Sequence, residues 1–323
     1  VVRENLLEGA ILTRVASSHI RVGTFQYIAA RQNIEDLKTL VDYTIERHYP
    51  QIESSKTKAL DLLNLVMEKQ CQLVVDWMRV GFIHGVMNTD NMTISGETID
   101  YGPCAFMDQY HPKTVFSSID KLGRYAYSNQ PPITKWNLTR FAECLIPLID
   151  KKEDTAIKIA TDVIDNFQNI YEKKWLNMMR DKLGLFGEDK NDRKLVDDLL
   201  IWMEENKIDY TNIFCHLMQI KIDNNTYKDK TFLTWFDEWK KRSQLNNSSK
   251  EKQIELMKKN NPIVIPRNHK VEEALTEANN GSLETMNKLN DILKNPYSNR
   301  EDIAEYQVPA PTTNEKYQTF CGT

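Results

Sequence analysis

The chain has 323 residues, enough for about two domains, and 41% of them are hydrophobic against 27% charged. The 42 Lys and Arg nearly balance the 46 Asp and Glu, and the net charge of −4 argues against a nucleic-acid or anionic-membrane partner. The five cysteines contain no Cys-x-x-Cys pair, which argues against a zinc knuckle or a secreted disulfide scaffold. We expect a soluble protein of the reducing cytoplasm, without a membrane span.

The predicted elements begin with a β segment and continue as helices. Residues Arg14 to Phe25 mix β-branched and polar side chains, which favours a short strand. Asn33 is typical of the residue that caps a helix, and we expect that helix to end near residue 50. A longer apolar pattern predicts a buried helix over 55–80 that ends at Gly81.

Between Gly81 and Gly123 the helical periodicity is lost, and turn residues separate the strand-like pieces 93–94 and 98–99, which predict a small hairpin. Helical patterns then return, with polar breaks between them. The helices expected there are 137–149, 153–183, 192–205, 208–222, 231–243, 249–260, 270–280 and 283–294, followed by an extended tail over 295–323. The fold class is therefore mainly α, with small β elements.

The loop-rich segment contains HGVMNTDNM (84–92) and then IDYGP (99–103), which can be compared with the HRDxxxxN and DFG motifs of protein kinases. His84 matches the kinase histidine, and Asn91 and Asp100 match the two metal ligands. Their amide and carboxylate oxygens suit Mg²⁺. Val86 stands where a kinase has its catalytic base, so Asp90 is the nearest carboxylate that could accept a proton.

Six ordered blocks of sequence resemble the selenoprotein O family of kinase-like pseudokinases. They are TRVASSHIRVGTF (13–25), HGVMNTDNM (84–92), IDYGP (99–103), FMD (106–108), GRYAYSNQP (123–131) and NPIVIPRNH (261–269). The resemblance implies the carboxyl-terminal lobe of a protein-kinase-like fold with additional helices. It also implies a protein adenylyltransferase that moves AMP from ATP to Ser, Thr or Tyr hydroxyls of protein substrates.

The resemblance assigns roles to individual residues. Asp90 resembles the proton acceptor, Asn91 and Asp100 resemble the ligands of Mg²⁺ or Mn²⁺, and Arg14 and Arg21 resemble the phosphate-binding arginines. Asp100 would contact the nucleotide through the metal. Guanidinium groups suit such contacts because they bind phosphate oxygens in pairs. We expect His84 to be structural, because this position braces the loop in kinases.

The resemblance also predicts how the chain is divided. Residues 1–150 would be the kinase-like catalytic core, 151–294 the helical carboxyl-terminal part of the lobe, and 295–323 the tail. Family members carry an upstream lobe, and nothing that corresponds to it precedes Val1. We therefore expect the 323-residue chain alone to have weak activity or none.

Several alternatives remain open. Asp90, Asn91 and Asp100 could be ordinary turn residues, and the two arginines could form surface ion pairs. The protein could instead be a phosphotransferase that uses Asp90, or a silent nucleotide-binding pseudokinase, and UTP could replace ATP. The family often has a cysteine near its end, where Cys321 lies, and a bridge from it to Cys104 competes with two separate thiols.

Overall fold

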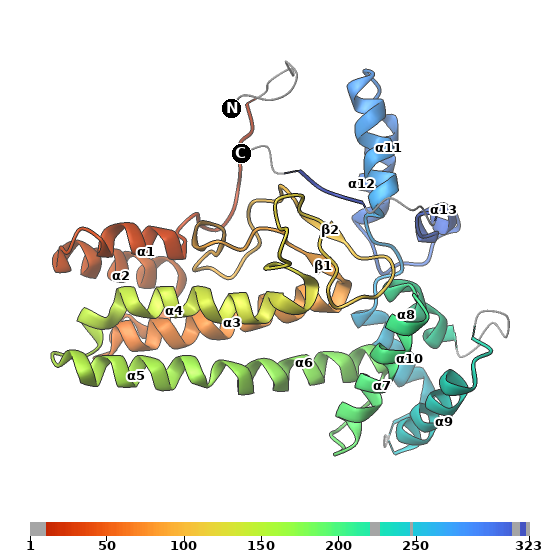
Figure 1. Ribbon diagram of the computed structural model, residues 1–323, viewed down its shortest axis with the longest axis horizontal. Helices are drawn as coiled ribbons and strands as arrows, with labels where there is room; N and C mark the ends of the chain where they lie inside the picture. Colours follow the sequence, from red (N-terminus) through yellow and green to blue (C-terminus); the bar gives the residue numbers. More distant parts are fainter. Residues whose placement is uncertain (1–10, 220–226, 246–247, 312–316, 321–323) are drawn as a thin grey trace.

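The computed structural model describes residues 11–219, 227–245, 248–311 and 317–320. Helices dominate these ranges, which confirms the prediction of a mainly α protein (Figure 1). The longer helices are α1 (Val22–Ala29), α2 (Ile34–His48), α3 (Lys58–Val80), α4 (Gln130–Ile149), α5 (Glu153–Asp165), α6 (Phe167–Leu183), α7 (Asp192–Glu205), α8 (Tyr210–Gln219), α9 (Lys230–Gln244), α10 (Lys250–Asn260), α11 (Asn268–Asn279) and α12 (Glu284–Leu293).

Helix α3 is the centre of the packing. It contacts α4 along one side and α6 along another, and Figure 1 shows α5 and α6 running along the same direction beneath them. Its apolar residues repeat at three- and four-residue spacing, so Leu62, Leu63, Val66 and Val74 all lie in the core with no exposed surface. The buried helix predicted over 55–80 is confirmed.

The predicted helix ends are also confirmed where a specific residue defines them. The Asn33 side chain accepts hydrogen bonds from the backbone N–H groups of Glu35, at 3.1 Å, and Asp36, at 3.4 Å. Helix α3 ends at Gly81, whose φ of +73° is a left-handed conformation that glycine adopts without a steric penalty.

Two small β features follow α3. Strands β1 (Phe82–Ile83) and β2 (Ala105–Phe106) pair antiparallel, with Phe82 opposite Phe106. Between them, Met92 and Thr98 form a separate antiparallel bridge, which confirms the small hairpin predicted there. The β1–β2 pair therefore closes residues 84–104 into one loop that contains the hairpin.

The strand predicted for Arg14 to Phe25 is wrong. Residues 11–20 have no regular structure, Arg21 forms a single antiparallel bridge with Thr93, and α1 begins at Val22. Phe25 is fully buried, and its ring meets that of Phe141 in α4 edge-to-face at 4.8 Å between centroids. Packing of this face against α4 therefore outweighs the β preference of the segment.

Three further boundaries differ from the prediction. Helix α4 begins at Gln130, seven residues early, because Pro131 lies in its first turn, where the missing N–H costs nothing. The helix expected over 153–183 is two helices, α5 and α6, that meet at Asn166. Residues 301–307 of the predicted extended tail form η4 (Glu301–Ile303) and α13 (Ala304–Gln307).

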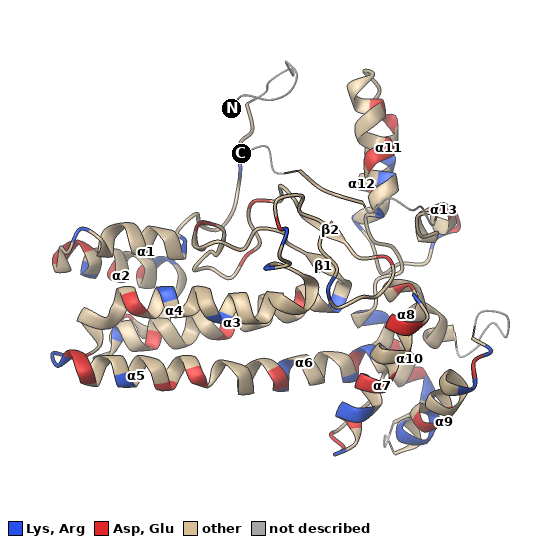
Figure 2. Ribbon diagram, in the orientation of Figure 1, with Lys and Arg blue, Asp and Glu red and all other residues tan. Residues whose placement is uncertain are grey.

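The surface of these elements carries both signs of charge. Figure 2 shows Lys and Arg interspersed with Asp and Glu along most helices, as the near balance of charged residues leads one to expect. Across the described ranges, no helix combines the length and the apolar content needed to cross a bilayer.

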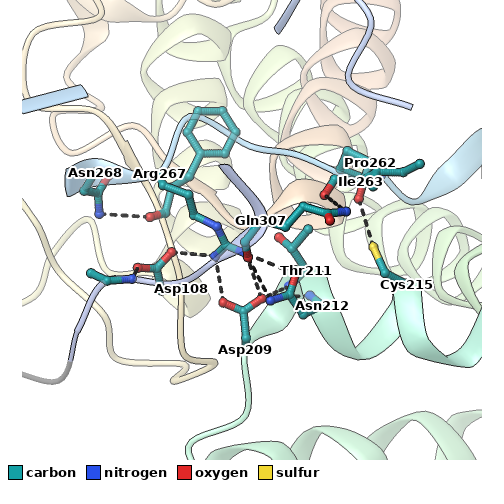
Figure 3. A network of polar contacts seen from close by, with 12 residues as sticks. Asp108, Asp209, Thr211, Asn212, Cys215, Pro262, Ile263, Arg267, Asn268 and Gln307 are labelled. Carbon is teal, nitrogen blue, oxygen red and sulfur yellow. Dashed lines mark hydrogen bonds and ion pairs between the residues drawn. The ribbon is translucent and has the colours of Figure 1, made fainter. Parts of the chain in front are cut away.

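A buried guanidinium joins three distant segments of the chain (Figure 3). Arg267 has no exposed surface, and its Nη1 donates to Asp108 Oδ1 at 2.6 Å and to Asp209 Oδ2 at 2.7 Å. Its Nη2 donates to Asn212 Oδ1 at 3.2 Å and to the Gln307 carbonyl at 3.0 Å. The FMD and NPIVIPRNH blocks therefore meet in one ion-pair network that also holds α8 and α13.

Candidate functional site

His84 connects the two loops that carry the candidate site. Its ring is fully buried, and Nδ1 accepts a hydrogen bond from the Val86 N–H at 3.4 Å, so Nε2 carries the proton and donates to the Ile99 carbonyl at 2.8 Å. Burial lowers the pKa of His84, which favours this neutral form. The ring therefore acts as a brace between residues 84–92 and 99–103, as predicted.

Side chains of helix α4 hold the start of the same loop through hydrogen bonds. Gln130 Oε1 accepts a hydrogen bond from the His84 backbone N–H, and Gln130 Nε2 donates to the Phe82 carbonyl, both at 3.0 Å. Asn137 Nδ2 donates to the Met87 carbonyl at 2.8 Å. These two side chains were not predicted as positioning residues. Gln130 lies inside the GRYAYSNQP block, which was the one available signal.

Asp90 and Asn91 lie on the 3-10 turn η2 (Thr89–Asn91). The Asp90 side chain is exposed, and its backbone carbonyl accepts a hydrogen bond from Arg21 Nη1 at 3.1 Å. Asn91 is 8% exposed, and its Nδ2 donates to the Val86 carbonyl at 3.0 Å. That bond leaves Oδ1 as the amide atom that could coordinate a cation.

Asp100 lies on the second loop, where its φ of +60° is a left-handed conformation. Arg14 Nη2 lies 3.5 Å from Asp100 Oδ1, and the two side chains are 55% and 28% exposed. The loops approach each other at Gly85, whose φ is +86° and where a Cβ would lie 2.8 Å from the Pro103 carbonyl oxygen. A side chain at Gly85 would push the Asp100 loop away.

The segment that carries both arginines is tied down at Ser17. Its N–H and Oγ donate to the Glu97 carboxylate at 3.1 and 2.7 Å, and Arg47 Nη2 donates to its carbonyl at 2.8 Å. The Ser17 hydroxyl bond lowers the pKa of Glu97, so the carboxylate stays charged. No pattern in the sequence indicates this Glu97 contact, which holds the segment with Arg14 and Arg21 next to the loops.

The structure therefore places the five predicted site residues in two groups: Arg21 donates to the backbone of Asp90, which precedes Asn91, and Arg14 lies beside Asp100. Among the described residues, no three His, Cys, Asp or Glu side chains form a closed metal cluster. One amide oxygen and one carboxylate fit Mg²⁺, which takes oxygen ligands and completes its shell with nucleotide phosphates and water.

Residues 317–320 return to this region from the far end of the sequence. The Thr319 N–H donates to the Phe116 carbonyl at 2.8 Å, and the Ser118 N–H donates to the Thr319 carbonyl at 2.9 Å. Thr319 Oγ1 donates to the Pro103 carbonyl at 2.6 Å. This end segment therefore holds the loop that follows Asp100.

The two alternatives for Cys104 and Cys321, a bridge or two separate thiols, both stay open, because Cys321 lies outside the described residues. The Cys104 thiol donates to the Tyr101 carbonyl at 3.3 Å. Burial raises the pKa of Cys104 to about 11, so the thiol is protonated at neutral pH.

Comparison with known proteins shows the family to which the chain belongs. Residues 1–294 match the model of a family described as protein adenylyltransferase SelO. The chain is 66% identical over 324 residues to the protein nucleotidyltransferase YdiU of Pelagibacter ubique, covering 100% of this chain and 67% of that protein. It is 55% identical over 323 residues to the protein nucleotidyltransferase YdiU of Bacillus cereus, covering 99% and 66%.

These matches confirm the resemblance seen in the sequence blocks. The relatives are nucleotidyltransferases by name, and the chain belongs to the SelO family. It spans about two thirds of the length of these curated relatives.

Proposed function

We propose that this chain carries the catalytic loops of a protein adenylyltransferase, which moves AMP from ATP to Ser, Thr or Tyr hydroxyls of other proteins. The observations that support this most directly are the hydrogen bond of Arg21 to the Asp90 backbone carbonyl and the ion pair of Arg14 with Asp100. Two guanidinium groups beside a candidate proton acceptor and a candidate metal ligand are suited to a nucleotide phosphate that reacts with a hydroxyl.

In the proposed reaction the acceptor hydroxyl oxygen attacks the α-phosphorus of ATP. The bond from the α-phosphorus to the bridging oxygen breaks, pyrophosphate leaves, and the hydroxyl proton passes to the Asp90 carboxylate. Asp90 is suited to this because its side chain is exposed while its backbone is held by Arg21. The exposed, 3.5 Å pair between Arg14 and Asp100 is weak, which lets Arg14 turn toward a phosphate.

Asn91 Oδ1 and the Asp100 carboxylate would hold Mg²⁺, or Mn²⁺ in its place. When bound, the cation offsets the negative charge of the phosphates in the transition state. The hydrogen bond of Asn91 to Val86 and the left-handed backbone of Asp100 prepare the two ligands before nucleotide binding.

The architecture we propose is the carboxyl-terminal lobe of a kinase-like fold, acting in the cytoplasm, with residues 1–150 as its catalytic core. Residues 151–294 would complete the lobe, and 295–323 would be its tail. The support is the order of elements around the site: helix α3, the short strand β1, the 84–92 loop held by α4, a hairpin and the second loop.

The test uses the complete gene product with ATP labelled at the α- or the γ-phosphate, alongside Asp100→Ala. Asp162→Ala, on the exposed face of α5, is the matched control. We expect label to enter protein from the α position, to fall by about 100-fold or more in Asp100→Ala, and to stay unchanged in the control. Label from the γ position would mean a phosphotransferase, and none from either position a nucleotide-binding module.

A further inference from the structure

The end segment, residues 317–320, lies on the rest of the chain as an added strand. Thr319 forms a parallel β-bridge with Ser117. The Thr319 N–H donates to the Phe116 carbonyl at 2.8 Å, and the Thr319 carbonyl accepts from the Ser118 N–H at 2.9 Å. In Figure 1 the end segment is the dark blue trace beside the loop-rich segment. The main-chain groups of residues 116 and 118 therefore form a strand edge that can pair with any extended peptide.

The side chains of the end segment alternate between the protein and the solvent. Tyr317 is half-buried and Thr319 is 9% exposed, whereas Gln318 and Phe320 are exposed. This alternation has the period of a β-strand. The positions of Tyr317 and Thr319 can therefore select a side chain, and the two positions that face outward cannot.

The first inward position fits a tyrosine. The Tyr317 ring meets the buried ring of Phe116 edge-to-face, with 5.9 Å between the centroids. Its hydroxyl donates to Glu272 Oε1 on α11 at 2.8 Å. A phenylalanine in this position would lack the hydrogen bond, and an alanine would lack the ring contact as well.

The second inward position takes a hydroxyl group next to the candidate site. Thr319 Oγ1 donates to the Pro103 carbonyl at 2.6 Å. The same carbonyl oxygen faces Gly85, where a Cβ would lie 2.8 Å from it. The hydroxyl of the end segment is therefore held at the point where the two candidate loops approach each other.

The end segment leaves one polar group at this edge without a partner. Ser117, directly opposite Thr319 in the bridge, is 4% exposed, and among the described residues its Oγ has no hydrogen-bond partner. A buried hydroxyl without a partner lowers the stability of the state that contains it. The contact with the end segment is therefore one that another segment can match or exceed.

We propose that this edge is a binding site for an extended polypeptide segment with tyrosine two residues before serine or threonine. The protein substrate of the transfer reaction supplies that segment, and residues 317–320 occupy the site until the substrate displaces them. The contacts above define the chemistry of the ligand, and its identity as a substrate rests on the proposed function. Main-chain hydrogen bonds supply the affinity of such an added strand, and its alternate side chains supply the specificity.

The binding test is done without nucleotide, so that it does not depend on the transfer reaction. The probe is a blocked decapeptide with Tyr-Gln-Thr-Phe at its centre. Three counterparts have Ala for Tyr, Ala for Thr, or an N-methyl group on the Thr nitrogen. Thr319→Pro removes the N–H and the hydroxyl of Thr319 and so releases the end segment, and Gln318→Ala, with its exposed side chain, is the matched control.

We expect the probe to bind Thr319→Pro about tenfold more tightly than it binds the parent chain or Gln318→Ala. The reason is that a segment attached to the same chain competes at a high effective concentration. Each counterpart lacks a contact made at the edge, so it should bind Thr319→Pro about tenfold more weakly than the probe does. Equal binding of the probe and its counterparts would overturn the strand site.

Hydrogen exchange in the parent chain gives a result that does not depend on how well a variant folds. An excess of the probe should speed exchange in residues 317–320 and leave residues 116–118 protected, because the probe replaces the same contacts. Unchanged exchange in 317–320 would also overturn the strand site. Sedimentation equilibrium tests the other occupant: a dimer of the parent chain that Thr319→Pro abolishes would assign the edge to the end segment of a second copy.

Transfer of label from ATP tests whether the ligand is the protein substrate. In the complete gene product, Thr319→Pro should raise the entry of α-phosphate label into protein about tenfold at low substrate concentration, because the site is then free, and Gln318→Ala should not. Probe binding without this rise would overturn the assignment to the substrate. Absence of label in the parent would overturn the proposed function and that assignment together, whereas probe binding would still support the strand site.

Discussion

Replacing Arg267 with Met, a side chain of similar length without charge, tests whether the network in Figure 3 holds the fold together. The substitution removes hydrogen bonds to Asp108, Asp209, Asn212 and Gln307, and leaves two carboxylates that are 18% and 11% exposed without their cation. Removing one partner of a buried ion pair costs about 3–5 kcal/mol. That is a large part of the about 5–15 kcal/mol typical of folded domains.

The assay is urea unfolding followed by circular dichroism at pH 7, with two comparisons. Arg267→Lys keeps the charge but not the paired donors, so we expect an intermediate loss of unfolding free energy. Arg300→Met removes a surface arginine that pairs with Asp302 at 2.7 Å, and we expect no measurable loss of unfolding free energy, because solvent screens such pairs. A loss below about 1 kcal/mol in Arg267→Met would refute the reasoning.

The pH dependence gives a second check. Burial raises the pKa of Asp209 even beside Arg267, and the loss of the guanidinium will raise it further. A folded-state pKa above the unfolded value means that the folded variant binds protons as the pH falls through that pKa, and is stabilised by them. The gap between Arg267→Met and the parent chain should therefore narrow from pH 7 to pH 5, and a constant gap would contradict this.

Three further outcomes are expected around the site. Gly85→Ala should lower the midpoint of thermal unfolding and weaken nucleotide binding, because a Cβ there would lie 2.8 Å from the Pro103 carbonyl oxygen. Gly187→Ala is the control, since Gly187 has a similar φ but open space around it, and it should leave nucleotide binding unchanged. Burial lowers the pKa of His84 below its usual value of about 6.5, so as the pH falls the unfolded chain binds a proton that the folded chain does not. The free energy of unfolding of the parent chain should therefore fall from pH 7 to pH 5, and it should fall less steeply in His84→Asn. Thr319→Val removes the hydrogen bond to Pro103, which should cost about 1 kcal/mol and speed hydrogen exchange in residues 116–118; unchanged exchange would mean that the end segment does not hold the loop.

Local signals predicted much of the helical framework. Asn33 and Gly81 mark helix ends through their own hydrogen bonding and backbone freedom, so the sequence alone identifies them. No glycine or proline marks the break between α5 and α6 at Asn166. The segment around Phe25 forms a helix because Phe25 packs against α4. Tertiary packing decides such cases, and a local pattern does not contain it.

In the candidate site, too, local sequence identifies some residues, and tertiary contacts that the sequence does not contain position them. The blocks of sequence identified Asp90, Asn91 and Asp100 as neighbours along the chain, and their roles remain a proposal. The contacts that position them could not be predicted, because Gln130 and Glu97 act through backbone groups far away in the sequence. A side chain that bonds to a distant carbonyl or N–H leaves no mark in the residue type of its partner.

The buried ring of His84 belongs to the core and to the candidate site at once, since it packs against Trp77 while it bonds to the second loop. A mutational scan will therefore record its substitutions twice, as lost abundance in the cell and as lost activity. Only activity normalised to the amount of folded protein will separate residues such as His84 and Gln130 from Asp90, whose exposed side chain can be changed with little effect on abundance.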